Sequence, residues 1–182
     1  MLVVGDSLSA EYGLARGTGW VALLTQKLQA DKVPAQVVNA SISGDTTAGG
    51  RARLPALLKT HQPKVVVIEL GSNDALRGLS LQATQANLTA MTQAAQQAGA
   101  KVLLIGMQMP PNYGAAYGKQ FSDLFGQVAK ANGAALVPFM LKGVADQADA
   151  LKLFQADRIH PTAEAHPTIL ANIYPSLRKM LP

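Results

Sequence analysis

The sequence contains no cysteine, few aromatic residues and few charged residues. Without cysteine, disulfide bonds, thiolate metal sites and a cysteine nucleophile are all excluded. Apolar runs are short, and none approaches the ~18 residues that a membrane-spanning helix requires. Aromatic residues make up only 5% of the chain, so few rings are present on which nucleic-acid bases or sugars would stack. We therefore expect no stable membrane insertion and no nucleic-acid partner.

The remaining composition is that of a globular protein. Hydrophobic residues make up 48% of the 182 residues, which is enough for one domain spanning residues 1–182 to bury a core without disulfides. The formal net charge is +5, but the lysines and arginines are scattered along the chain. This distribution predicts an ordinary basic surface instead of a nucleic-acid patch. We expect the protein to be a monomer.

The hydrophobic pattern alternates between strand-like and helix-like segments. Strands are predicted at residues 2–5, 35–40, 64–71, 101–107 and 134–139, and helices at 19–32, 46–61, 80–98, 119–131 and 162–180. Pro55, Pro167 and Pro175 are expected to disturb their helices. The alternation predicts an α/β fold, a three-layer α/β/α arrangement around a five-stranded parallel sheet with the flavodoxin-like order 2-1-3-4-5.

Polar residues follow the predicted strands at one edge of this sheet. In open α/β sheets the ligand lies outside the carboxyl ends of the strands, near the switch in strand order. Ser7 in "GDS" follows the first strand, and Gly44 in "SISGDTT" follows the second. Asn73 in "GSND" follows the third, while Asp157 and His160 in "DRIHP" come after the fifth. The sequence therefore predicts a functional site at this edge.

Ser7, His160 and Asp157 are the residue types of a nucleophilic triad. A serine hydroxyl is a weak nucleophile unless a base takes its proton, and histidine exchanges protons near neutral pH. Asp157 is predicted to accept a hydrogen bond from Nδ1 of His160, which leaves Nε2 for Ser7. Taken singly, Ser7 is explained as a helix cap and His160 as a surface residue beside a capping aspartate. Their convergence at one edge favours catalysis.

Acyl transfer also needs hydrogen-bond donors for the developing oxyanion. The candidates are the backbone N–H groups of Ser7 and Gly44 and the side-chain amide of Asn73. Taken singly, Gly44 and Asn73 are explained as turn residues. The other two histidines, His61 and His166, are predicted to lie on the surface and to take no part in the site.

The motifs "GDSLS", "SISGDTT", "GSND" and "DRIHP" resemble, in order and along nearly the whole chain, the sequence blocks of the SGNH (GDSL) hydrolase family. Within that family the sequence looks most similar to the bacterial TesA type of thioesterases, arylesterases and lysophospholipases. The resemblance implies hydrolysis of small-molecule acyl esters and thioesters (EC 3.1 class) through an acyl-enzyme intermediate, with no cofactor and no metal. It implies that Ser7 is the nucleophile, that Asp157 and His160 complete the triad, and that Ser7, Gly44 and Asn73 form the oxyanion hole.

The same resemblance implies a precursor that is exported to the periplasm. Because a strand is predicted to begin at the first residues, we expect the signal peptide to have been removed. No G-x-S-x-G motif occurs, so the nucleophile elbow of ordinary α/β-hydrolases is not expected.

Two other functions stay open at this stage. A carbohydrate or other small-ester deacetylase would use the same triad on the same fold. A non-enzymatic, flavodoxin-like binding module would instead use Asp6, Asp74 and Asp157 to bind Mg²⁺, although no glycine-rich phosphate loop occurs.

The substrate groove is predicted from the loop at residues 107–118. Met107, Met109, Pro110, Pro111 and Tyr113 would either wall an acyl chain or pack the loop onto the sheet. Gly114 and Gly118 would allow this loop to move. Leu8, Leu76 and Ile159 are expected to add to the same apolar surface.

Overall fold

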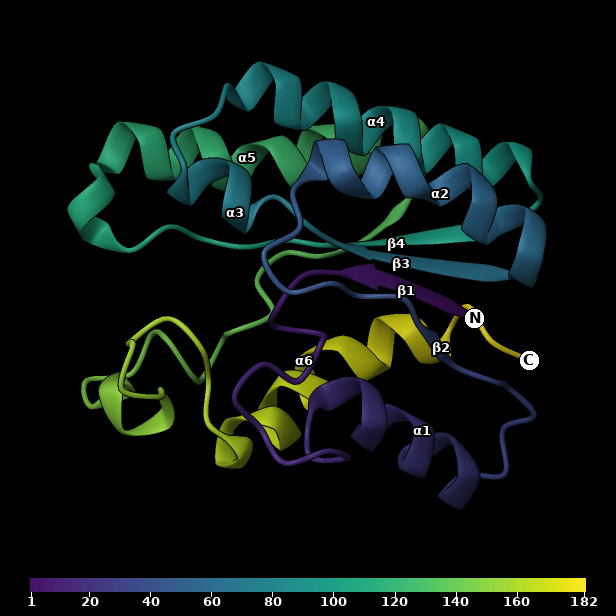
Figure 1. Cartoon of the computed structure of the whole chain (residues 1–182), viewed down its shortest axis with the longest axis horizontal. Coiled ribbons are helices and arrows are strands. Elements are labelled where there is room, and N and C mark those ends of the chain that lie inside the picture. The colour runs from purple at the N-terminus through teal and green to yellow at the C-terminus, as the bar shows by residue number, and fades with distance from the viewer.

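A five-stranded parallel sheet, in the order β2-β1-β3-β4-β5, forms the centre of the computed structural model, which describes residues 1–182 (Figure 1). Every neighbouring pair of strands is parallel. The strands are β1 (Leu2–Gly5), β2 (Val38–Asn39), β3 (Val65–Glu69), β4 (Lys101–Ile105) and β5 (Ala135–Val137). The predicted strand order is therefore confirmed, with the switch between β1 and β3.

Helices cover both faces of the sheet, which confirms the three-layer arrangement. Helices α2, α4 and α5 pack together on one face, and α1 and α6 on the other (Figure 1). The helices are α1 (Trp20–Ala30), α2 (Thr47–His61), α3 (Ser72–Leu76), α4 (Leu81–Gln97), α5 (Ala115–Asn132) and α6 (His166–Arg178), with 3-10 turns η1 (Pro111–Tyr113), η2 (Ala150–Leu153) and η3 (Ala163–Ala165). No helix is both long and apolar enough to cross a membrane.

The helix boundaries differ from the predictions at several points. Helix α3 was not expected, because its five residues are too few to show a helical period. Helix α5 begins at Ala115, so Gly118 lies inside a helix and not in a loop. Pro55 and Pro175 lie within continuous helices on exposed positions, where water can bind the carbonyl group that proline leaves without a partner. Pro167 takes a place in the first turn of α6, where no N–H is needed.

The prediction that His166 lies on the surface is wrong. Its side chain is buried, and Nδ1 accepts a hydrogen bond of 2.9 Å from the backbone N–H of Trp20. Trp20 is the first residue of α1, and Gly19, the N-cap residue before it, has no side chain to cap the helix. His166 therefore caps α1 from the first turn of α6, a contact between segments 146 residues apart. His61, by contrast, is exposed at the end of α2, as predicted.

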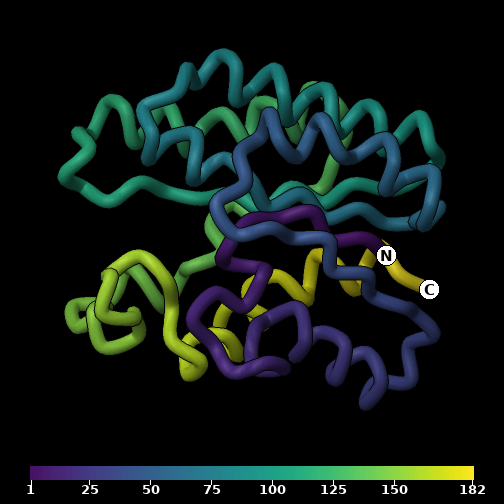
Figure 2. The backbone as a smooth tube through the Cα atoms, in the orientation of Figure 1, coloured from purple at the N-terminus to yellow at the C-terminus, as the bar shows by residue number.

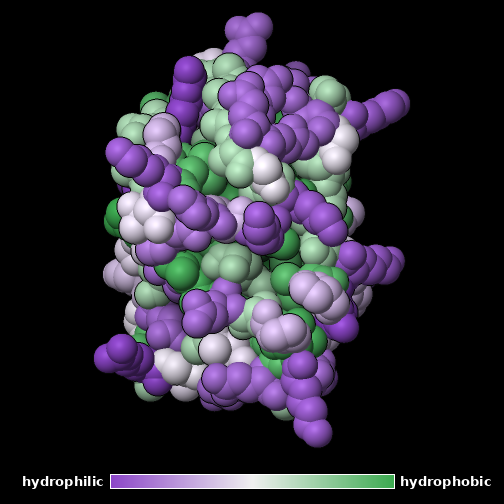
Figure 3. Space-filling view, turned by 90° about the vertical axis from the view of Figure 1, so that its right-hand side faces the viewer, coloured by the Kyte–Doolittle hydropathy of each residue, from purple (hydrophilic) through white to green (hydrophobic).

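The basic residues, although scattered in the sequence, gather where the strands begin. Eight of the 16 lysines and arginines are exposed at this edge, close to helix C-termini or strand starts: Lys27, Lys32, Lys59, Lys64, Lys101, Lys130, Arg178 and Lys179. Figure 3 views the molecule from this side, where long hydrophilic side chains project. Cations at helix C-termini interact favourably with the helix dipole, so the arrangement of the helices accounts for this grouping.

At the opposite edge, two segments that are far apart in the sequence lie side by side (Figure 2). One is the turn that follows β1, and the other is the irregular segment at residues 140–161. Gln155 joins them, because its Nε2 donates to the carbonyl groups of Tyr12 and Pro161, each at 3.0 Å. This edge holds the carboxyl ends of the strands and therefore the predicted site.

Candidate active site

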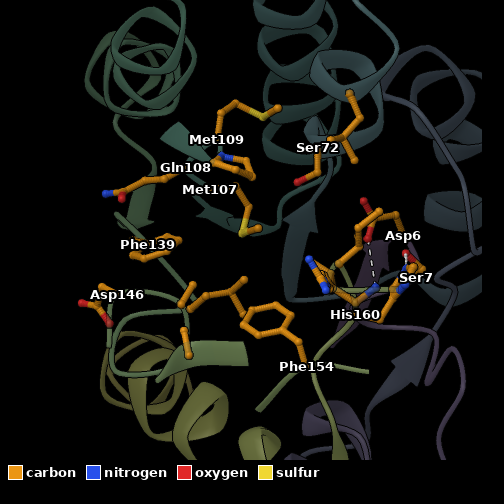
Figure 4. Close-up of a pocket in the computed structure, with 18 of the residues that line it drawn as sticks. Asp6, Ser7, Ser72, Met107, Gln108, Met109, Phe139, Asp146, Phe154 and His160 are labelled. Atoms are coloured by element: carbon orange, nitrogen blue, oxygen red, sulfur yellow. Dashed lines mark hydrogen bonds between the residues drawn. The ribbon is translucent and has the colours of Figure 1, made fainter. Parts of the chain in front are cut away.

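Ser7, His160 and Asp157 form a continuous hydrogen-bonded series at this edge, and Figure 4 shows Ser7 and His160 side by side. The distance from His160 Nε2 to Ser7 Oγ is 2.8 Å, and the distance from His160 Nδ1 to Asp157 Oδ2 is 2.6 Å. Ser7 is the second residue after β1 and lies in a turn, so it does not cap a helix. The structure brings these three predicted residues together in the predicted order of contacts.

The loop around Asp157 fixes the carboxylate toward the imidazole. Asp157 Oδ1 accepts hydrogen bonds from the backbone N–H groups of Ile159 and His160, at 2.9 and 3.0 Å. Desolvation would raise the pKa of Asp157, but these bonds and the His160 ring lower the pKa to about 2. Asp157 is therefore a carboxylate near neutral pH, and its Oδ2 accepts the hydrogen bond from Nδ1–H of His160.

Two further residues, which the sequence did not single out, hold His160 in place. The Tyr12 ring lies against the imidazole, with 4.4 Å between the ring centroids. Gln155 fixes the backbone of His160, because the Gln155 backbone N–H donates to the His160 carbonyl at 2.8 Å. The Gln155 side chain donates to the backbone carbonyl of Tyr12. Arg158 closes the same turn with a positive φ of 59°.

The three predicted oxyanion donors differ in their present partners. The backbone N–H groups of Ser7 and Gly44 make no hydrogen bond within the chain. Gly44 adopts a φ of +78°, which favours glycine, and its carbonyl accepts from Arg77 Nη2 at 2.8 Å. Asn73 Nδ2 donates to the Asp45 carbonyl and to Asp6 Oδ2, both at 2.9 Å. Two donors are thus free, and the third is shared between two acceptors.

Asp6 connects these groups beneath Ser7. It is buried, and its Oδ1 accepts from the Leu8 N–H at 3.0 Å while its Oδ2 accepts from Asn73. Burial raises the pKa of Asp6 to about 6, although the Leu8 hydrogen bond and the charge of His160 oppose the shift. Asp6 therefore fixes the turn that carries Ser7 and the side chain of Asn73 with one carboxylate.

A pocket of about 570 Å³ opens beside Ser7 and His160. In Figure 4 it extends from these two residues, past Phe154 and Met107, to Phe139 and Asp146. The predicted residues Met107, Met109, Pro110 and Pro111 line it, as do Leu8, Leu76 and Ile159, whereas Tyr113 does not. No periodic pattern in residues 139–154 predicted that their side chains would face the pocket. This segment provides the remaining apolar lining: Phe139, Leu141, Ala145, Ala150, Leu151 and Phe154.

The three aspartates of the Mg²⁺ alternative do not share a site. Asp6 accepts from Leu8 and Asn73, and Asp157 accepts from His160. Asp74 is buried under α2, where it accepts from the backbone N–H and the hydroxyl of Thr47. No three acidic or histidine side chains come together as a metal-binding group. The arrangement gives no support to this alternative.

Comparison with known proteins places this geometry in a family. Residues 3–167 match the GDSL-like lipase/acylhydrolase family. The chain belongs to this family. The predicted family and the predicted enzyme class, a hydrolase of acyl esters, are confirmed.

Individual members of the acylhydrolase family are similar over nearly the whole chain. Esterase TesA of Pseudomonas aeruginosa is 52% identical over 181 residues, which cover 100% of this chain and 89% of the relative. Thioesterase 1/protease 1/lysophospholipase L1 of Escherichia coli is 44% identical over 93% of this chain and 78% of the relative. A crystal structure of TesA superposes with a TM-score of 0.95 at 53% identity, covering 99% of this chain and 98% of that one.

Proposed function

We propose that this acylhydrolase cleaves acyl esters and thioesters with Ser7 as the nucleophile, His160 as the general base and acid, and Asp157 as the residue that orients His160. The observation that carries the proposal is the series of contacts from Asp157 through His160 to Ser7, at 2.6 and 2.8 Å. It ends at the mouth of a pocket with an apolar lining. The names of the relatives, an esterase and a thioesterase/lysophospholipase, agree with it.

The first half of the reaction acylates Ser7. Nε2 of His160 takes the hydroxyl proton while Oγ attacks the carbonyl carbon of the substrate. The free N–H groups of Ser7 and Gly44 donate to the oxyanion of the tetrahedral intermediate. Asn73 adds a third donor when its amide exchanges one of its two present acceptors for the oxyanion. The intermediate collapses when His160 gives the proton to the leaving alcohol or thiol, and an acyl-Ser7 ester remains.

The second half releases the acid. Water loses a proton to His160 and attacks the acyl-Ser7 carbonyl, and His160 then returns the proton to Ser7 Oγ as the carboxylic acid leaves. Asp157 stays ionised throughout, because its pKa is lowered to about 2. It stabilises the imidazolium that forms in both halves.

The pocket supports an acyl group longer than acetyl. Its methionine and phenylalanine side chains, Met107, Met109, Phe139 and Phe154, provide an apolar wall that adapts to a flexible chain. The polar residues Ser7 and His160 lie at one end of this wall, and Asn73 is joined to this end by its hydrogen bond to Asp6. We therefore place the ester carbonyl at Ser7 and the alkyl chain along the pocket.

Active-site labelling tests the nucleophile. A fluorophosphonate probe should label the wild-type chain at Ser7, and Ser7→Ala should remove both labelling and hydrolysis of p-nitrophenyl esters and acyl-CoA thioesters. The change should lower kcat by about 10⁴-fold or more. Full activity of Ser7→Ala would overturn the proposal. Loss of wild-type activity with EDTA would instead indicate metal-dependent chemistry, and activity confined to acetyl esters would indicate a deacetylase.

A further inference from the structure

Two carboxyl groups are buried next to each other behind the proposed nucleophile. Glu69 ends β3, where it is paired in register with Gly5 of β1, and Asp6 follows directly. Their exposed fractions are 0% for Glu69 and 1% for Asp6. The Glu69 carboxyl group lies against Asp6, because its Oε2 accepts a hydrogen bond from the Asp6 backbone N–H at 3.2 Å. Because two carboxylates in contact within a protein interior cannot both be ionised at low cost, the pair must hold a proton.

The donors around Asp6 show that it acts as an acceptor. Its Oδ1 accepts from the Leu8 N–H at 3.0 Å, and its Oδ2 accepts from Asn73 Nδ2 at 2.9 Å. Both oxygens thus face N–H groups, as a carboxylate requires. The charged or titratable groups that act on Asp6 are Glu69, His160 and Asp45, and among them only His160 favours the ionised form through its charge.

The donors around Glu69 are distributed unequally between its two oxygens. Oε2 accepts from the Ser9 hydroxyl at 2.7 Å and from the Asp6 backbone N–H at 3.2 Å. The Ser9 hydroxyl proton is free to point at Glu69, because Ser9 Oγ itself accepts from Trp20 Nε1 at 3.1 Å. Oε1 is buried and receives no donor from the chain. A proton on Oε1 would turn this one unpartnered oxygen into a donor.

We propose that Glu69 is held as a neutral carboxylic acid whose Oε1 proton is donated to Asp6, and that this hydrogen bond positions the Asp6 carboxylate that holds Leu8 and Asn73. Every polar atom of the group then has a partner. The series runs from Trp20 through Ser9 and Glu69 to Asp6, and from Asp6 to the backbone beside Ser7 and to the Asn73 amide. A buried network in which all members are satisfied fixes its geometry more firmly than its single bonds would.

The electrostatic environment agrees with this assignment. Burial and the neighbouring charge of Asp6 raise the pKa of Glu69 well above the usual value, and the hydrogen bond from Ser9 only partly opposes the shift. The hydrogen bond from Glu69 lowers the pKa of Asp6. The two carboxyl groups therefore differ in role. Glu69 is a positioning residue that acts through Asp6, and it does not touch the substrate. This positioning role rests on the proposed function, whereas the proton on Glu69 does not.

Infrared spectroscopy tests the proton directly and requires no catalysis. At pH 8 Asp6, with a pKa of about 6, is ionised, so we expect wild type to show the carbonyl-stretch band of a buried protonated carboxyl group. Glu69→Gln should remove this band and Asp6→Asn should retain it. Absence of the band from wild type, or its loss in Asp6→Asn but not in Glu69→Gln, would overturn the assignment.

A pair of variants then tests positioning. Glu69→Gln keeps an amide donor for Asp6 and should retain kcat/KM within about threefold, whereas Glu69→Leu removes the donor and should lower it tenfold or more. Glu69→Leu also lacks the hydrogen bond that lowers the Asp6 pKa, so this pKa should rise. The acid limb of its kcat/KM profile should therefore move to higher pH. In Glu69→Gln the limb should stay where it is in wild type.

Equal losses in the two variants with unshifted acid limbs would show that Glu69 is only structural. If Glu69→Leu fails to fold, the infrared comparison of wild type, Glu69→Gln and Asp6→Asn still decides where the proton is. A Ser7→Ala variant that stayed active would refute the proposed function and leave the infrared result unchanged, so the two failures are distinguishable.

Discussion

The ring of Tyr12 covers the imidazole of His160, with 4.4 Å between the centroids and 39° between the planes. Tyr12 belongs to the turn that begins at Ser7, so the segment that carries the nucleophile also restrains its base. An aromatic face stabilises a neighbouring cation. The Tyr12 ring is therefore positioned to favour the imidazolium that forms when His160 accepts a proton.

Tyr12→Ala should lower kcat for p-nitrophenyl butyrate by about 2- to 5-fold, since an exposed cation–π contact contributes ~0.5–1 kcal/mol. Tyr12→Phe keeps the ring and should stay close to wild type, because the effect depends on the ring face and not on the hydroxyl. Steady-state kinetics of the three proteins checks this. Equal rates for wild type and Tyr12→Ala would show that the Tyr12 ring does not stabilise the imidazolium of His160.

The hydrogen bond from Trp20 to His166 makes stability depend on pH. Burial lowers the pKa of His166, although the charge of Glu11 opposes the shift. The folded-state pKa thus lies below the unfolded value of ~6.5. The stabilisation from the neutral ring is complete above the unfolded value and is lost as the pH falls from there through the folded-state pKa. His166→Leu should lower the free energy of unfolding by about 1–2 kcal/mol at pH 8. Its difference from wild type should narrow at pH 5.

Urea unfolding at the two pH values provides the measurement. The matched control is His61→Leu, because His61 is exposed at the end of α2. Its difference from wild type should be the same at both pH values. A pH-independent difference for His166→Leu would show that the ring contributes only by packing.

Gly5 is required by the side chains behind it. A Cβ atom at this position would lie 2.7 Å from Glu69 Oε2 and 2.8 Å from Ser9 Oγ. Both atoms belong to buried side chains that are hydrogen-bonded to each other, so neither can move freely. Gly5→Ala should therefore destabilise the protein by about 1–3 kcal/mol. Gly118→Ala, within α5 where a Cβ meets no atom, should instead stabilise it by ~0.5–1 kcal/mol, and thermal unfolding distinguishes the two signs.

The site could be predicted from the sequence because it depends on a rule of topology. The carboxyl ends of parallel strands meet at one edge, so residues that directly follow a strand, such as Ser7 and Asn73, can be placed without a structure. His160 follows no strand directly, but its spacing from Asp157 marked the pair. Glu69 also has a sequence signal, a charged residue inside an otherwise apolar strand, but the valine and isoleucine residues before it dominate the strand pattern.

The remaining features depend on contacts between distant segments, which no local pattern contains. His166 is buried because α6 meets the start of α1, and a single histidine near a helix start does not reveal that. The apolar residues of 139–154 have no helical or strand period, so their orientation toward the pocket follows only from the path of the chain. The same holds for Gln155, whose partners are Tyr12 and Pro161.

The end of the pocket away from Ser7 should determine which acyl chains fit. Ala145 lines the pocket and adjoins Asp146, which Figure 4 places at that end. Ala145→Trp would fill this end with an indole ring while leaving Ser7 and His160 untouched. Hydrolysis of p-nitrophenyl palmitate should fall by about tenfold or more, because the lost chain burial is worth ~0.8 kcal/mol for each CH₂ group, and hydrolysis of p-nitrophenyl acetate should be unchanged.

Ala148→Trp is the matched control, because Ala148 is exposed in the same segment but does not line the pocket. It should hydrolyse both esters as wild type does. If Ala145→Trp lowered the rates for acetate and palmitate equally, the ring would be disturbing the triad and not the chain. If neither rate changed, the alkyl chain would have to leave Ser7 in another direction.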